Sequence, residues 1–293
     1  MSKARERFNA LKESGYPLEH LAEMSLCVAA EFHPYLNVAS SLYELELITM
    51  DAQDYVDLNS EPQQSAEQLC RYLHDIKGFR GNQENYYDPQ NSFLNIVLKR
   101  RLGIPITLAV IYISVGRGMG LAIEGINFPE HFLVALKPNR AQFATQQHAE
   151  KSKASAMDDS IIIDPFSGEL LFKEDCQKRL NAINTPHRLN PDHLTPISGK
   201  AMLLRIVANL KMAYLARKEY ENALKACDTV LDIAPESHID IRDRAMILEE
   251  LGCTHAAIHE FERLLGFLPQ AQFSQAIEKR ISKLKGNQSL PIH

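Results

Sequence analysis

The stretch that decides the fold is RLGIPITLAVIYISVGRGMG, residues 101–120. Pro105 suits the first turn of a helix, where a missing backbone N–H costs nothing. The residues after it are almost all apolar, which predicts a helix buried on most of its sides. The apolar run 104–115 is interrupted and shorter than the roughly 20 residues that cross a bilayer. We therefore interpret it as the central helix of a globular domain.

Short apolar runs, rather than one long helical pattern, follow this helix. They are AIEGINF at 122–128, HFLVAL at 131–136 and SIIID at 160–164. Each is rich in β-branched or aromatic residues and bounded by Gly, Pro or Asp, which predicts strands of an antiparallel sheet on the central helix. The polar residues 137–159 between the last two runs predict a long mobile loop.

The residues before the central helix have helical periodicity. Residues 1–78 predict several helices, with Ser40 and Ser41 as caps of one of them. Residues 67–76 predict another helix, and SFLNIVLKRR at 92–101 predicts the one that directly precedes the central helix. The chain thus begins with a helical region that leads into a mixed core.

The C-terminal third carries an internal repeat. Three pairs of residues are each 34 positions apart in the sequence: Ala223 and Ala257, Cys227 and Phe261, and Pro235 and Pro269. Small residues let two helices approach closely, and the prolines end the second helix of each unit, as in tetratricopeptide repeats, which have this period. The proline-rich residues 184–199 predict a linker, and residues 200–293 predict the repeat domain.

Composition and charge exclude several classes of protein. The net charge of −5 shows no basic footprint for nucleic acid, and the start of the chain lacks the apolar core of a signal peptide. Five scattered cysteines without a close pair argue against a disulfide framework or a zinc ribbon. We expect a reduced, soluble, cytoplasmic protein that binds neither nucleic acid nor membrane.

Three polar residues follow in the order of a hydrolase triad. Thr107 lies at the start of the central helix, His131 at the head of a predicted strand and Asp164 at the end of the next one. A helix N-terminus offers free N–H groups that can stabilise an oxyanion. If the two strands pair, Asp164 can lie beside His131 and fix its tautomer. These positions form the candidate catalytic site.

The flanking motifs carry a family resemblance. Residues 79–112, together with GINFPEHFLVAL at 125–136 and IIIDPFSGELL at 161–171, closely resemble the SirB/YchA-type bacterial proteins. That family combines an N-terminal transglutaminase-like domain with C-terminal tetratricopeptide repeats. The resemblance covers about residues 15–285.

The resemblance implies an α+β fold: a helical N-terminal region and a papain- or transglutaminase-like core over residues 1–183, then the linker and the all-α repeats. Active relatives of that superfamily have a cysteine at the start of the central helix, where this chain has Thr107. His131 and Asp164 match the superfamily His and Asp. Glu130 replaces the small residue that often precedes this histidine, which adds a carboxylate near the site.

Each candidate also has a purely structural interpretation. Thr107 at a helix start is a good cap, and we favour capping or binding over nucleophilic attack. For His131 we favour a pair with Asp164 over a single histidine bonded to a backbone carbonyl. For Asn91, Asn95 and Asn127 we favour turn or cap chemistry over a role as polar liners of the site.

Other charged residues suggest structural roles. Arg100 and Arg101 suit the C-terminal end of a helix better than an anion site. His255 and His259 are four residues apart but have no convincing third ligand, so we expect no metal and no cofactor. None of the five cysteines has a recognisable catalytic partner.

Two function classes follow, and a third stays open. The first is a non-catalytic transglutaminase-like module that binds a peptide or protein or acts in regulation. The alternative is a peptidase, amidase or acyltransferase that uses Thr107, His131 and Asp164. In the third, only the repeats matter, as an adaptor. The repeats either bind a partner segment or only brace the first domain.

Overall fold

The computed structural model describes residues 2–138, 160–183, 188–267 and 274–287. The predicted mobile loop falls mostly on residues 139–159, and Pro269 of the repeat also lies outside the described residues. The chain divides into two compact units, Met1–Ile206 and Val207–His293. We call them the first and the second unit.

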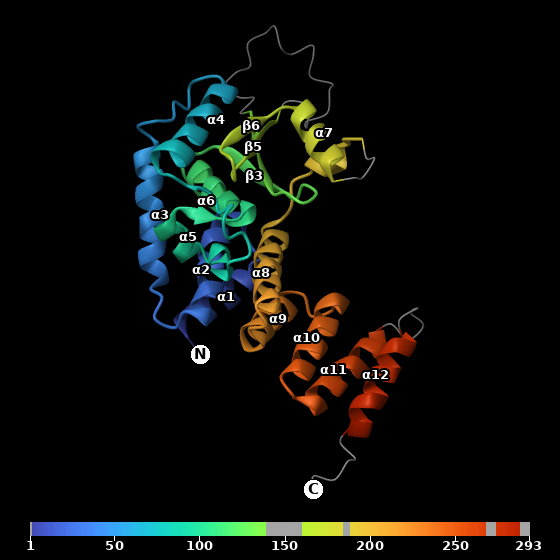
Figure 1. The fold of residues 1–293 in the computed structure, drawn as a ribbon. Coiled ribbons are helices and arrows are strands. Elements are labelled where there is room, and N and C mark those ends of the chain that lie inside the picture. The colour runs from blue at the N-terminus through green and yellow to red at the C-terminus, as the bar shows by residue number, and fades with distance from the viewer. Residues whose placement is uncertain (1, 139–159, 184–187, 268–273, 288–293) are drawn as a thin grey trace. The chain divides into compact units, whose positions relative to one another are not determined.

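The first unit is α+β, as predicted. Its helices are α1 (Lys3–Glu13), α2 (Leu21–Phe32), α3 (Val38–Ala52), α4 (Pro62–Cys70) with a π-helical extension (Arg71–Ile76), α5 (Leu94–Arg100), α6 (Pro105–Gly118) and α7 (Lys173–Ala182). Its strands are β1 (Arg80–Gly81), β2 (Leu102–Gly103), β3 (Ala122–Ile126), β4 (Leu133–Lys137), β5 (Ile161–Asp164) and β6 (Glu169–Leu171). The four longer strands form one sheet, and helices lie around it in Figure 1.

The predicted central helix is α6, which begins at Pro105. Ten further residues of α6 are buried, because it contacts α2, α3 and α5 as well as β3 and β4. Its C-terminal half packs on the sheet where Gly116 lies against Ile123. The prediction that this apolar helix is buried on most of its sides is therefore confirmed.

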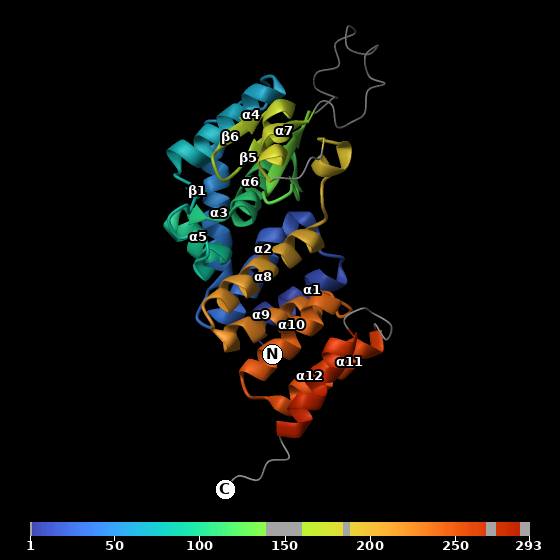
Figure 2. The same cartoon turned by 45° about the vertical axis from the view of Figure 1, so that its right-hand side comes forward.

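The sheet is antiparallel with the order β3-β4-β5-β6. Three of its strands match the predicted runs, and β6 was missed. Side chains alternate between its two faces, so that Leu133, Ala135 and Ile162 share one face. That face packs against Cys176 and Leu180 of α7. Helices α6 and α7 thus flank the sheet from opposite sides (Figures 1 and 2).

Two local features differ from the sequence prediction. Helix α3 begins earlier than expected, and its cap is Asn37, whose side chain accepts the N–H of Ser40. The prediction of Ser40 and Ser41 as caps was therefore wrong. The short parallel pair of β1 with β2 was also missed. It brings the residues after β1 beside the start of α6.

The second unit is all-α. Its helices are the end of α8 (Gly199–Ala216), then α9 (Tyr220–Ile233), α10 (His238–Glu250), α11 (Thr254–Phe267) and α12 (Ser274–Asn287). Consecutive helices from α9 to α12 contact one another (Figure 1). The small repeat residues Ala223 and Ala257 are fully buried, and Phe261 lies in the core shared by α10, α11 and α12. The helical repeat that the sequence predicted is confirmed.

The predicted linker has contacts with the sheet of the first unit. Pro196 forms an isolated bridge with Ile126, and the N–H of Ile197 donates to the carbonyl of Gly125 over 2.9 Å. Residues 184–187 lie outside the described part. The linker role of residues 184–199 stays a prediction.

Candidate functional site

Thr107 is the third residue of α6, and its side chain is only 1% exposed. Its Oγ1 accepts the N–H of Ile104 over 3.2 Å. The same hydroxyl donates to the carbonyl of Asn91 over 2.8 Å and lies 3.1 Å from the carbonyl of Ile104. Thr107 therefore caps the N-terminus of α6, whereas the choice of capping over nucleophilic attack stays a prediction.

The surroundings of Thr107 leave it little room. A Cβ on Gly103 would lie 2.9 Å from Oγ1 of Thr107. The carbonyl that accepts the Thr107 proton belongs to Asn91, which is fully buried. The Asn91 side chain accepts from Asn82 over 2.9 Å and donates to the carbonyl of Asn85 over 2.8 Å. The candidate nucleophile position is thus part of a network of hydrogen bonds.

This network also accounts for one of the three candidate asparagines. The turn chemistry expected for Asn91 is confirmed by its bonds to Asn85 and Tyr86. Asn95 is buried, but its Oδ1 has no hydrogen-bond partner among the described residues, so no turn or cap contact accounts for that oxygen. Asn127 is exposed.

Asp164 ends β5, and its carboxylate is almost fully buried. One oxygen accepts the N–H of Phe166 over 2.8 Å. The other forms an ion pair of 2.7 Å with Arg179 of α7. The same guanidinium nitrogen lies 3.4 Å from Nδ1 of His131. Among the described contacts, Asp164 thus reaches His131 through Arg179, which differs from the direct pair that we expected.

The three triad positions therefore fall into two groups. His131 and Asp164 share a partner on α7, whereas Thr107 at the start of α6 bonds to nearby backbone groups. Sequence reasoning missed Arg179. Its only signal was a basic side chain in the last turn of a helix, which is a common arrangement at helix C-termini.

The electrostatics of His131 follow from these neighbours. Burial and the adjacent Arg179 cation lower its pKa below the ordinary value of 6.5, and Asp164 and Glu130 oppose this only in part. The imidazole is therefore neutral near neutral pH. Because Arg179 can only donate, its 3.4 Å contact with Nδ1 is a hydrogen bond only in the tautomer that carries the ring proton on Nε2. In a hydrolase triad the proton is on Nδ1 and the lone pair on Nε2 faces the nucleophile.

Glu130 is exposed, and its backbone is left-handed, with φ of 55°.

The two arginines before α6 have structural contacts, as we expected. Arg100 pairs with Asp88 over 3.0 Å. Arg101 ends α5 in a left-handed conformation and pairs with Glu44 over 3.2 Å.

The cysteines offer no alternative nucleophile. All five are free thiols, and Cys27, Cys70, Cys176 and Cys227 are buried. Burial raises the pKa of Cys27 to about 11 and that of Cys70 and Cys227 to about 12. Only Cys253 is exposed. In the described ranges, no three His, Cys, Asp or Glu side chains gather in a way that could hold a metal ion.

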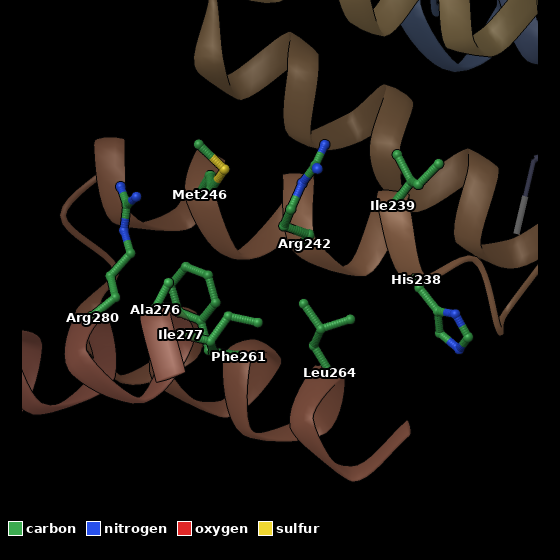
Figure 3. A pocket seen from close by; sticks show the side chains of 9 residues that line it. All are labelled: His238, Ile239, Arg242, Met246, Phe261, Leu264, Ala276, Ile277 and Arg280. Atoms are coloured by element: carbon green, nitrogen blue, oxygen red, sulfur yellow. The ribbon is translucent and has the colours of Figure 1, made fainter. Parts of the chain in front are cut away.

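The second unit has a groove of about 400 Å³ between α10, α11 and α12. Phe261, Leu264 and Ile277 form its apolar floor (Figure 3). Arg242 of α10 and Arg280 of α12 lie at its rim. The groove residues are His238, Ile239, Arg242, Met246, Phe261, Leu264, Ala276, Ile277 and Arg280, and none of them is acidic.

Both arginines of the rim have one carboxylate partner outside the groove. Arg242 pairs with Asp243, and Arg280 pairs with Glu249 over 2.6 Å. Each guanidinium has five N–H donors, so donors remain for a ligand. The exposed apolar side chains Ile239 and Met246 add contact area beside them. The groove is therefore apolar at its base and positive at its edge.

Comparisons with known proteins agree with this architecture. Residues 39–208 match the model of the transglutaminase-like superfamily, and residues 210–282 match a tetratricopeptide repeat model. No solved structure matches the chain significantly. None of the helices within the described residues is long and apolar enough to cross a membrane.

Several curated relatives match nearly the whole chain. A UPF0162 protein of Xylella fastidiosa strain Temecula1 is 30% identical over 286 residues, which covers 93% of this chain and 92% of the relative. A UPF0162 protein of Vibrio cholerae is 25% identical and covers 97% of this chain and 99% of the relative. Protein SirB1 of Salmonella typhimurium is 22% identical over 84% of this chain and 85% of the relative. The chain therefore belongs to the SirB-type family of the transglutaminase-like superfamily, with tetratricopeptide repeats at its C-terminus.

Proposed function

We propose that this chain is a non-catalytic transglutaminase-like protein that binds a segment of another protein through the groove of its repeats. Its first unit keeps the superfamily architecture without a working nucleophile. Its second unit supplies the surface that a peptide can occupy. The hydroxyl of Thr107 is the observation that carries this proposal.

That hydroxyl is fully engaged in holding the helix. Its proton goes to the Asn91 carbonyl, and a lone pair accepts the Ile104 N–H. Attack on a substrate would require breaking these bonds in a site that is 1% exposed. A buried donor and acceptor left unpaired cost about 1–3 kcal/mol each, so the cap opposes catalysis.

The histidine supports the same conclusion. With Arg179 donating to Nδ1, the proton on Nε2 leaves that nitrogen unable to accept one from a hydroxyl. A threonine hydroxyl is not ionised near neutral pH and needs such a base. The Thr107–His131–Asp164 enzyme remains the hypothesis that the first experiment below addresses.

The groove supports the binding role. Its floor can take one or two apolar side chains, and the free donors of Arg242 and Arg280 suit carboxylates of the same segment. Helix-lined grooves of stacked repeats are common peptide sites. We therefore propose an acidic segment with an apolar anchor as the ligand of the groove.

The catalytic half of the proposal is tested with an engineered thiol. In a Cys253→Ser background, which removes the exposed cysteine, the variant Thr107→Cys is treated with iodoacetamide under native conditions. We expect almost no labelling during the time in which Cys253 of the unmodified chain reacts fully. Fast labelling that His131→Ala abolishes would show a nucleophile site with active geometry and would overturn the proposal.

The binding half is tested with a fluorescent peptide in which Leu alternates with Asp and Glu. Anisotropy titrations with the full chain should show binding that Arg242→Ala or Arg280→Ala weakens about tenfold, which corresponds to about 1.4 kcal/mol. The matched control is Arg217→Ala, because Arg217 also has an exposed ion pair, with Glu219, but lies outside the groove. Equal affinity for all four proteins would contradict this role of the groove.

A further inference from the structure

Helix α3 of the first unit exposes large apolar side chains on its outer face. Tyr43, Leu47 and Met50 are 59%, 46% and 58% exposed. Their spacing of four and three residues places them on one face of the helix. The opposite face, with Leu45 and Ile48, is buried. We call Tyr43, Leu47 and Met50 the α3 stripe.

The clustering of these side chains distinguishes them from ordinary exposed residues. Single exposed apolar residues are normal on protein surfaces, whereas contiguous patches mark interaction sites. Of the 13 exposed large apolar side chains in the described ranges, five lie between Tyr35 and Tyr55. The α3 stripe accounts for three of those five. A surface of this kind gains free energy when another apolar surface covers it.

The segment of sequence that carries the stripe has charged side chains of one sign. Residues 34–70 contain seven acidic residues and no Lys, Arg or His. The whole chain has a net charge of −5, so the remainder, −5 minus −7, is +2. The negative charge of this protein is thus concentrated in the segment that carries α3.

The helical positions place carboxylates on both sides of the stripe. Glu46 lies on one side, and Glu44 and Asp51 lie on the other. Glu44 and Asp51 are already paired, with Arg101 and Lys77. Glu46 is exposed and has no ion pair with any residue that the structure describes. At least one carboxylate beside the stripe can therefore meet a cation from outside.

A groove of about 550 Å³ runs beside the stripe, between α2, α3 and the end of α6. Leu42 and Leu45 contribute apolar surface to it, and Glu46 and Met50 belong both to this groove and to the outer region of α3. The cation Arg117 also lines it and donates to the carbonyl of Ile123 over 3.3 Å. An apolar side chain from outside can therefore enter next to the stripe.

We propose that the α3 stripe and this groove form a docking surface for a basic amphipathic segment of a partner protein. The apolar side chains of that segment cover Tyr43, Leu47 and Met50, and its Lys or Arg side chains meet Glu46 and the other carboxylates. The sign of the charge selects against nucleic acid and anionic lipid, which this surface repels. The surface is independent of the repeat groove, whose rim is positive and takes the opposite charge.

The test uses two fluorescent amphipathic model peptides of equal length. In the first, Leu on one face of the helix is combined with Lys on the other, and in the second, Glu replaces every Lys. We expect the full chain to bind the Lys peptide through α3. Any binding of the Glu peptide, which suits the repeat groove, should be unchanged by Leu47→Ser and weakened by Arg242→Ala. Binding of the Lys peptide should weaken when NaCl rises from about 50 to about 300 mM, because exposed charge pairs are screened by salt.

Variants locate the binding surface. Leu47→Ser should weaken binding of the Lys peptide about tenfold, and Glu46→Lys should weaken it further at low salt. The matched control is Phe172→Ser, because Phe172 is equally apolar and 60% exposed but lies outside the stripe and the groove. Circular dichroism should show that all three variants stay folded, since each changes an exposed side chain. If Leu47→Ser and Phe172→Ser bind the Lys peptide equally well, the proposal is wrong.

Discussion

Each unit buries a cluster of charged side chains, and the two clusters differ in composition. In the first unit a single cation, Arg179, lies between the carboxylate of Asp164 and the ring of His131. In the second unit a buried cation, Lys211, lies between the carboxylates of Asp240 and Asp243, and the exposed Arg242 is a second partner of Asp243. The first cluster has the sequence order of a catalytic site, and the second has no catalytic signature.

Burial of charged groups does not by itself indicate a catalytic site. Buried titratable groups with shifted pKa values often mark active sites, but structural ion pairs shift them equally. Burial opposes the charge on Lys211, yet its hydrogen bonds to Asp240 and Asp243 raise its pKa overall. Burial and the Arg179 cation instead lower the pKa of the His131 ring. In both units burial and the neighbouring charges, rather than the residue types alone, decide which groups can exchange a proton.

The largest effect is expected in the second unit. Lys211→Met leaves two carboxylates without their buried cation, which should lower the free energy of unfolding by about 3–5 kcal/mol. Urea denaturation of the full chain, followed by circular dichroism, measures this loss. The matched control is Arg217→Met, which breaks an exposed pair and should cost about 1 kcal/mol or less. Equal losses would show that the Lys211 cluster is not a buried network.

The corresponding change in the first unit should be smaller. Arg179→Met leaves Asp164 with one backbone donor, but Arg179 is partly accessible to water. We expect a loss of about 2–3 kcal/mol, below the value for fully buried pairs. The second change Asp164→Asn, in the same background, should recover part of it because no buried charge remains. Additive losses in the double variant would argue against the pairing.

Thr107 should give the next effect. Thr107→Val keeps the shape and removes the hydroxyl, which leaves the Ile104 N–H and the Asn91 carbonyl without this partner. The expected loss is about 2 kcal/mol. Thr107→Ser keeps the hydroxyl and should cost about 1 kcal/mol or less, for one buried methyl group. If Thr107→Val were as stable as the unchanged chain, the hydroxyl would not be a structural cap.

The smallest effect is a titration. NMR of the His131 ring, assigned with His131→Asn, should give a pKa below 6.5, and Arg179→Met should raise it because the cation is lost while Asp164 remains. The lowered folded pKa means that the unfolded chain binds this proton more readily. The stability contribution of His131 is therefore complete above pH 6.5 and is lost as pH falls toward the folded pKa. A pKa unchanged by Arg179→Met would contradict the placement of that cation.

Local sequence patterns predicted most of the fold. The apolar run of α6, the short β-branched and aromatic runs of the strands and the constant spacing of the C-terminal repeat all predicted elements that the structure contains. Strand β6 and the pair of β1 with β2 are too short to show a period, with three and two residues. The cap of α3 was misplaced because Asn37 competes with two serines that are equally good in isolation.

The site was predictable only in part. Motifs located Thr107, His131 and Asp164, since each follows a recognisable helix or strand boundary. They could not predict Arg179, which comes from the helix after β6 and acts through a contact made in the folded chain. A sequence pattern reports which side chains are present at a site, whereas the partner that neutralises them is a property of tertiary packing.

Helix α8 spans Gly199–Ala216, and the boundary between the two units falls inside it, between Ile206 and Val207. Its first half belongs to the core of the first unit: Met202 and Leu203 are fully buried, and a Cβ on Gly125 would lie 2.7 Å from the Met202 sulfur. A first unit that ended at residue 199 would lack Met202 and Leu203 and would leave a cavity in its core. We therefore expect that isolating the first unit requires keeping the chain up to about Ile206, so that α8 still fills this part of the core.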